Sequence, residues 1–153
     1  MRSQALHLLT LGTVIVVLLA CSGGSMAVSP NAPEPINASN TVTSQTSQVD
    51  NPVFTIPAGK RLVVDYVSAK GLVPAGESVS SISINLPVAH FFVVATQGTD
   101  QFGKSVFTAA QSLRATIGPF PVPTDVVVRM ERKMFGAGTE AALAVTLAGQ
   151  LLP

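Results

Sequence analysis

From Phe54 to the C-terminus, apolar and polar residues alternate with a period of two. The clearest stretch is Ser80–Leu86, in which isoleucine and leucine alternate with serine and asparagine. Successive side chains of a β-strand point to opposite faces, so this pattern predicts strands with one face in a core and the other in water. Helical spacing is rare, and we therefore predict an all-β domain.

Gly- and Pro-rich segments divide the alternating region into short strands. We expect these at residues 53–56, 61–69, 80–86, 89–96, 105–109, 112–117, 125–133 and 141–152. About seven to eight antiparallel strands at this spacing are typical of a β-sandwich or jelly roll. The loop Met134–Thr139 is long enough to join the last two strands as a hairpin. The alternative is a helix over Glu140–Gln150, but Gly149 would weaken its interior.

Two strands carry specific expectations about burial. In the strand at residues 61–69, the alternation places Leu62, Val64 and Tyr66 on one face, so Tyr66 should face the core. Phe91–Val94 is a continuous apolar run, which predicts a strand covered on both faces. His90 precedes that run and should be half-buried in the same strand.

The N-terminus has the features of an export signal. Arg2 precedes an apolar run from Leu8 to Ala20, which as a helix would span about 20 Å. A bilayer core is about 30 Å thick, so residues 1–20 are better interpreted as a signal peptide than as a membrane span.

Cys21, the only cysteine, directly follows Leu18-Leu19-Ala20. This resembles a lipobox, the site at which bacteria attach lipid to an exported protein. Lipidation of Cys21 would tether the chain to a membrane, and Ser22 after it indicates the outer membrane in a Gram-negative cell. The alternative is ordinary cleavage after Ala27, with small residues three and one before the bond, which would give a periplasmic or secreted protein.

Composition sets the expected domain organisation. Residues 21–51 are mostly small and polar, with two charged residues, and predict a lipid-anchored flexible linker. Residues 52–153 are enough for one β-sandwich domain. The chain has 9 basic and 8 acidic residues, and removing the signal peptide deletes Arg2. The mature chain is then formally neutral, so we expect no nucleic-acid partner.

The phrase Val53-Phe54-Thr55-Ile56-Pro57-Ala58-Gly59-Lys60-Arg61-Leu62-Val63, with Val64-Asp65-Tyr66-Val67-Ser68-Ala69 after it, resembles the opening strand of small exported bacterial β-sandwich proteins of undefined function. In these proteins a strand similar to Ala144–Gly149 closes the sandwich. The resemblance implies export and sandwich architecture, and it implies no catalytic residue.

Residues for catalysis or metal binding are scarce. The mature chain has one histidine, His90, so a nucleophilic triad is poorly supported, and histidine–cysteine metal sites are excluded by count. We expect no cofactor. Calcium would need Asp65, Asp100 or Asp125, which lack the spacing of a calcium loop. The basic residues Arg129, Arg132 and Lys133, interrupted by Glu131, are interpreted as a solvated strand edge.

Three functions are compatible with this sequence. The first is a non-enzymatic, membrane-tethered structural or protein-interaction module at the bacterial envelope. Its candidate partner contacts are Phe102 and Phe135, which fall beside glycine in predicted loops. The second is a module that binds a glycan or small molecule, although the chain has no tryptophan and one tyrosine. The third is a hydrolase, which would need His90, Asp65, Glu77, Glu131 or a serine to converge in one cleft.

Overall fold

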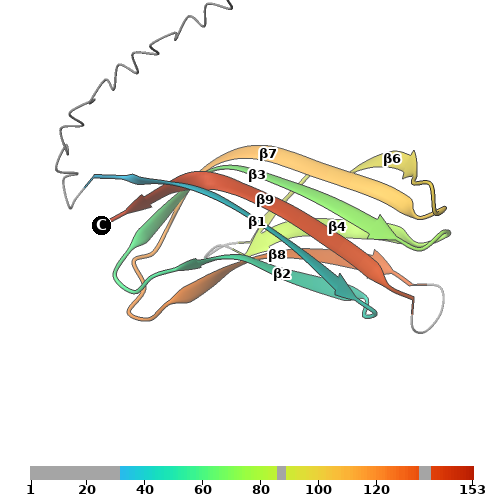
Figure 1. The fold of residues 1–153 in the computed structure, drawn as a ribbon, viewed down its shortest axis with the longest axis horizontal. Coiled ribbons are helices and arrows are strands. Elements are labelled where there is room, and N and C mark those ends of the chain that lie inside the picture. Colours follow the sequence, from blue (N-terminus) through green and yellow to red (C-terminus); the bar gives the residue numbers. More distant parts are fainter. Residues whose placement is uncertain (1–31, 86–88, 135–138) are drawn as a thin grey trace, which may run out of the picture.

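The computed structural model describes residues 32–85, 89–134 and 139–153. These residues form nine strands and no helix, in two antiparallel sheets that pack face to face, which confirms the predicted β-sandwich (Figure 1). The strands are β1 (Glu34–Ser44), β2 (Gln48–Ile56), β3 (Arg61–Val73), β4 (Ser78–Asn85), β5 (Ala89–Phe91), β6 (Ala95–Thr99), β7 (Ser105–Ile117), β8 (Thr124–Lys133) and β9 (Ala141–Leu152).

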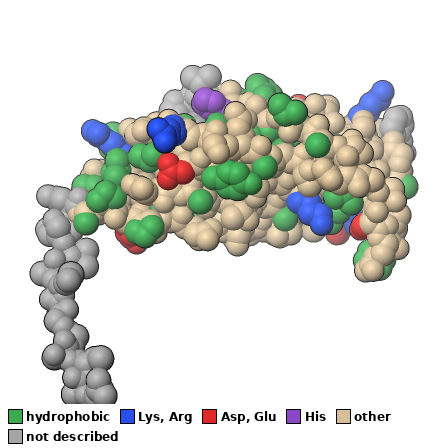
Figure 2. All heavy atoms as spheres, turned by 90° about the horizontal axis from the view of Figure 1, so that it is seen from above, with side chains coloured by type: hydrophobic (Ala, Val, Ile, Leu, Met, Phe, Trp, Pro, Cys, Tyr) green, Lys and Arg blue, Asp and Glu red, His purple; other side chains and the backbone are tan. Residues whose placement is uncertain are grey.

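The two sheets differ in size. The five-stranded sheet has the order β1-β9-β3-β7-β6, and the four-stranded sheet has the order β2-β8-β4-β5. Figure 2 looks onto the outer face of the five-stranded sheet, where charged side chains are few. Each face that meets the other sheet is apolar, since alternate residues point inward.

The core lies between the sheets and consists mainly of valine, isoleucine and leucine. In β9 every second residue from Ala141 to Leu151 is buried, and in β8 the buried apolar residues are Val126, Val128 and Met130. The largest side chains with essentially no exposure are Ile56, Leu62, Ile82, Ile84, Met130, Leu143 and Leu147.

The strand register defines two ends of the sandwich. Glu34 of β1 pairs with Leu151, and Leu62 pairs with both Leu151 and Ile117. These residues lie at one end, where the described chain begins and where its C-terminus lies; we call it the entry end (Figure 1). At the opposite end, Ser44 pairs with Ala141. We call this the far end, and it carries the β1–β2, β3–β4 and β6–β7 turns.

The expectation of a flexible linker through residue 51 was wrong for its second half. Residues 34–44 form β1, and residues 48–51 form the start of β2. β1 pairs with β9 over its whole length and turns Ile36, Ala38 and Val42 toward the core. Few large apolar side chains suffice here because main-chain pairing with β9 and three inward-facing contacts hold the strand. The predicted signal peptide and Cys21 lie outside the described residues.

The expected C-terminal hairpin was also wrong. Residues 141–152 form a strand, as predicted, and not a helix. However, β8 belongs to the four-stranded sheet and β9 to the five-stranded sheet. The segment between them therefore crosses from one sheet to the other, and its residues 135–138 lie outside the described residues.

Burial in β3 and around β5 differs from expectation. A β-bulge between Val64 and Tyr66 shifts the alternation, so Val67 and Ala69 face the core and Tyr66 is exposed. The apolar run at residues 91–94 is not a strand covered on both faces. The chain runs from β5, at the edge of the four-stranded sheet, to β6, at the edge of the five-stranded sheet. Along this path Phe91 and Val93 are exposed and Phe92 is buried.

Candidate functional site

Phe102 lies in the β6–β7 turn at the far end of the sandwich. The Asp100 carboxylate accepts hydrogen bonds from the main-chain N–H groups of Phe102 (2.9 Å) and Lys104 (2.8 Å). The Asp100 N–H donates to the Lys104 carbonyl (2.8 Å), and the Gly103 N–H donates to the Asp100 carbonyl (3.0 Å). Gly103 has a φ of 76°, a conformation that glycine adopts without strain. These bonds fix the turn.

The phenyl ring of Phe102 is 79% exposed. Bonds within the turn leave the ring in water, although burying a phenylalanine side chain is favourable by about 1.5–3 kcal/mol. The sequence placed this ring in a loop, and the structure agrees; its role as a partner contact stays a prediction. The second candidate contact, Phe135, lies outside the described residues.

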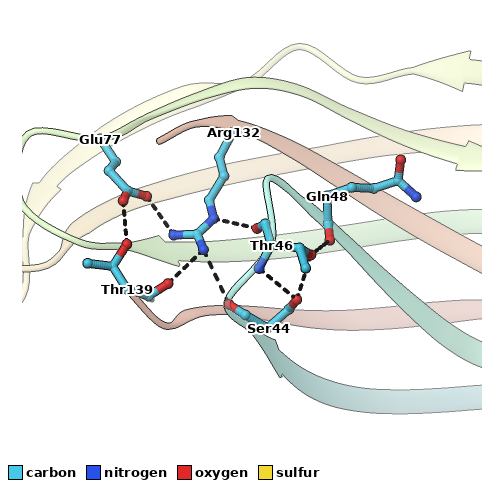
Figure 3. Close-up of polar contacts among 6 residues, drawn as sticks. All are labelled: Ser44, Thr46, Gln48, Glu77, Arg132 and Thr139. Carbon is cyan, nitrogen blue, oxygen red and sulfur yellow. Dashed lines mark hydrogen bonds and ion pairs between the residues drawn. The ribbon is translucent and has the colours of Figure 1, made fainter. Parts of the chain in front are cut away.

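A buried ion pair lies at the same end (Figure 3). The guanidinium of Arg132 donates to the Glu77 carboxylate at 2.5 Å, and their side chains are 0% and 2% exposed. Thr139 donates from its hydroxyl to the other Glu77 oxygen (2.6 Å). Burying two charges is costly unless their hydrogen bonds are satisfied, and here both carboxylate oxygens are.

Arg132 also joins several connections. It donates to the main-chain carbonyls of Thr46 (2.9 Å), Thr139 (2.7 Å) and Ser44 (3.3 Å). It therefore ties the β1–β2 turn, the β3–β4 turn and the residues before β9 to one side chain. Because these polar atoms are mutually paired, the arrangement holds the far end together and presents no free group for chemistry.

This position of Arg132 corrects the predicted solvated basic edge. Of that cluster, Arg129 is on the surface, where it forms a bidentate pair with Asp50 (2.7 and 3.1 Å). The guanidinium of Arg129 holds the pKa of Asp50 below its ordinary value, and hydrogen bonding to Asp50 raises the pKa of Arg129. The two arginines therefore have separate structural partners.

Of the residues proposed for hydrolysis, only a serine and Glu131 are seen in contact among the described residues: the Ser81 hydroxyl donates to the Glu131 carboxylate (3.2 Å). Asp65 is at the exposed bulge of the five-stranded sheet, Glu131 is exposed on β8, and Glu77 is paired with Arg132. His90 pairs with Ile84 at the edge of the four-stranded sheet and is exposed, so the expected half-buried histidine was wrong. No arrangement of nucleophile, base and orienting acid is seen in residues 32–85, 89–134 and 139–153.

The acidic residues considered for calcium have other partners. Asp100 accepts the turn N–H groups described above, and Asp125 accepts a hydrogen bond from Thr55 (2.6 Å). Within the described segments, no group of three or more histidine, cysteine, aspartate or glutamate residues could hold a metal ion.

Among the described residues, two hollows offer room for a small ligand. A pocket of about 290 Å³ opens at the entry end, lined mainly by apolar side chains. Its residues are Ile56, Asn85, Ile117, Phe120, Thr124, Asp125, Val126 and Val127. A depression of about 250 Å³ on the outer face of the five-stranded sheet is lined by Ser68, Lys70, Thr108 and small neighbours. It has no aromatic ring in its lining, and sugar-binding surfaces generally use one.

Sequence reasoning missed two buried polar features. One is the network of Arg132 described above. The other is Asn51 of β2, whose amide donates to the main-chain carbonyls of Leu143 (2.8 Å) and Asn40 (3.0 Å) across the sandwich. Its Oδ1 has no hydrogen-bond partner in the described structure. Arg132 continues the alternation of β8, whereas Asn51 fell in the segment predicted as a linker, and the partners of both residues are distant in sequence.

No protein-family model matches this chain, and no curated protein matches its sequence. In the part of the chain that the structure describes, no helix has the length and apolar character needed to cross a bilayer.

Proposed function

We propose that this chain is a non-enzymatic, membrane-tethered β-sandwich that binds a protein partner through its far end. The observation that carries this proposal is the exposed ring of Phe102 on a turn fixed by Asp100. A turn with a fixed main chain loses little conformational freedom when a partner covers it, and aromatic residues are enriched among the residues that dominate binding energy.

The proposed tether is a lipid on Cys21, which would place the protein on the bacterial envelope. It is supported by the Leu-Leu-Ala-Cys sequence after the apolar run. β1 begins at the entry end, and Phe102 lies at the opposite end of the sandwich. A membrane anchor before β1 would therefore leave Phe102 accessible.

Photo-crosslinking in living cells tests the partner site. A photoreactive phenylalanine analogue would replace Phe102 in the full-length chain, and the same analogue at Tyr66 is the matched control. Tyr66 is also an exposed aromatic residue, but it lies on the outer face of the five-stranded sheet. We expect a discrete protein adduct from position 102 and none from position 66.

The adduct identifies a partner whose affinity can then be measured. Phe102→Ala should weaken its binding about thirtyfold, as expected for a residue worth about 2 kcal/mol, without lowering the thermal unfolding midpoint. Equal adducts at both positions, or unchanged affinity of Phe102→Ala, would reject the site.

The anchor has a separate test. The intact mass of the full-length protein from membranes of a bacterial host should match a chain that begins at Cys21 and carries acyl groups. Cys21→Ser should lack this species. A soluble chain that begins near Val28 would reject lipidation and leave a secreted or periplasmic protein.

A second candidate function is binding of an apolar small molecule in the entry-end pocket. The apolar lining by Ile56, Ile117 and Phe120 favours it over a glycan. A fragment library screened by NMR would test this function. Shifts that cluster on Phe120 and Asn85 would support it, and shifts scattered over the surface would count against it.

A further inference from the structure

Two loops form an apolar tip at the entry end. The β2–β3 turn (residues 57–60) and the β7–β8 loop (residues 118–123) are joined by a hydrogen bond from the Gly59 N–H to the Phe120 carbonyl (2.8 Å). Gly118 packs so closely that a Cβ there would lie 2.8 Å from the Lys60 carbonyl oxygen. The exposed side chains of this tip are Pro57, Ala58, Pro119, Pro121, Val122 and Pro123.

Several main-chain polar groups of the tip are either missing or already hydrogen-bonded. Proline has no N–H, so three positions of the β7–β8 loop lack a donor. The Phe120 carbonyl accepts from Gly59, and the Val122 carbonyl accepts from the Thr124 hydroxyl (3.1 Å). Between the flanking prolines, the Val122 side chain is 61% exposed. These missing and paired groups lower the cost of moving the tip into an apolar phase.

The two ends of the sandwich differ in chemistry. The two loops of the tip contain one charged residue, Lys60, whereas the described far-end connections contain Glu77, Asp100, Lys104 and Glu140, of which Glu77 is buried against Arg132. The basic residues Lys60, within the tip, and Arg61, beside it, are balanced by Glu34 and Asp125 at the same end. The entry end thus has no excess of one sign, and apolar contact is the interaction it favours.

The sequence before β1 indicates which surface the tip would meet. Twelve residues lie between Cys21 and Glu34. Fully extended, this segment would span at most about 45 Å. β1 begins at the entry end, so the tether joins the sandwich closer to the tip than to the far end.

We propose that the tip inserts Val122 and its proline neighbours into the surface of the bilayer that holds the anchor. The sandwich would then stand on its entry end, with Phe102 directed away from the membrane. This inference rests on the membrane tether of the proposed function. Small apolar insertions combined with a lipid anchor strengthen membrane binding, because each adds buried apolar area.

The chain allows a clean test because it has one cysteine and no tryptophan. The chain from residue 21 would be coupled through Cys21 to a maleimide lipid in neutral phosphatidylcholine vesicles, in four forms. One form is the unsubstituted chain, which has no tryptophan. The other three carry Val122→Trp, Ala58→Trp or Phe102→Trp. Circular dichroism would confirm that each variant is folded. Ala58→Trp reports on the same tip if the β7–β8 loop does not tolerate tryptophan.

We expect the tryptophans at positions 122 and 58 to shift their emission to the blue and to lose most of it when the vesicles contain brominated lipid. The tryptophan at position 102 should do neither. The quenching should be about the same in 1 M salt as in 0.1 M salt. The higher salt concentration shortens the screening length from about 10 Å to about 3 Å, which weakens interactions between charges but not apolar contact. Equal behaviour of positions 122, 58 and 102 would overturn the proposal, as would loss of quenching in high salt.

Failure of this proposal and failure of the tether are distinguishable. The maleimide lipid supplies the anchor chemically, so the vesicle experiment does not depend on lipidation in cells. Absence of acylated Cys21 in cells, found by the mass measurement above, would reject the tether alone. An unquenched tip on anchored protein would reject insertion alone.

Discussion

Gly149 is the residue at which β9 comes closest to the bulge of β3. A Cβ at this position would overlap the main-chain carbonyl oxygen of Val63 and lie 3.1 Å from its carbon. Val64 pairs with Gly149, and Tyr66 pairs with Ala148, so Asp65 is the extra residue. The absence of a side chain at Gly149 is what lets the two strands approach at the bulge.

We predict that Gly149→Ala lowers the free energy of unfolding by more than about 3 kcal/mol, because main-chain atoms on two paired strands must move. Gly71→Ala is the matched control. Its Cβ would meet the Met130 sulfur at 2.5 Å, and a thioether can adopt another rotamer. We expect a loss of about 1–2 kcal/mol there. Urea unfolding of both variants measures the difference, and equal losses would contradict this account.

Single residues also show what the sequence could predict. Phe102 follows Asp100 and precedes glycine, and such turn residues correctly indicated an exposed loop. Tyr66 was assigned to the core because strict alternation continues from Leu62 and Val64. The bulge adds one residue, and every later side chain of β3 changes face. A bulge depends on the neighbouring strand's close approach, which a local pattern does not contain.

At the scale of the strand, β8 shows a signal that was present but not used. Its buried residues Val126, Val128 and Met130 continue by alternation to Arg132. The alternation thus placed Arg132 inward, while its charge suggested the surface. The charge is accommodated because Glu77, 55 residues earlier, turns inward beside it. A buried charge is predictable only when its partner is known.

For the buried pair of Glu77 and Arg132, we predict that the effect of Glu77→Ala on stability changes sign when Arg132 is absent. Glu77→Ala should lower the free energy of unfolding by about 3–5 kcal/mol, because it leaves the Arg132 guanidinium buried without its counter-charge. In an Arg132→Ala background the same substitution should be stabilising, since it removes an unpaired buried carboxylate. Urea unfolding of the four variants in a double-mutant cycle measures both values.

The exposed pair of Asp50, on β2, and Arg129, on β8, is the control for that cycle. Asp50→Ala should cost much less than Glu77→Ala, because Asp50 and Arg129 remain in water when separated. In an Arg129→Ala background Asp50→Ala should not become stabilising to the same degree. If the two cycles gave equal coupling energies, the buried network would not be what holds the far end.

At the scale of the molecule, local patterns predicted the strands better than their arrangement. The β-sandwich was correct, but β8 and β9 lie in different sheets although they follow each other in sequence. β1 was missed because most of its residues are serine, threonine or asparagine and only Ile36 and Val42 are large and apolar. It is held chiefly by main-chain pairing to β9. This pairing joins residues as distant in sequence as Glu34 and Leu151, which are more than 100 residues apart. Long-range pairing of this kind leaves little trace in composition.

The position of β1 predicts where the chain can be shortened. A chain of residues 32–153 should unfold in urea with the same midpoint as one of residues 28–153, because it keeps all nine strands. A chain that begins at residue 52 lacks β1 and the part of β2 that contains Val49 and Asn51, both buried. It also leaves the edge of β9 unpaired. We expect it to lose cooperative unfolding and to aggregate.

A chain that begins at residue 45 separates the two contributions. It keeps β2 and Asn51 but loses the three inward residues of β1 and the pairing with β9. We expect cooperative unfolding at a lower urea midpoint, measured by far-ultraviolet circular dichroism. If the chain from residue 52 were as stable as the chain from residue 32, β1 would be dispensable. The place where the tether joins the sandwich would then no longer be fixed at the entry end.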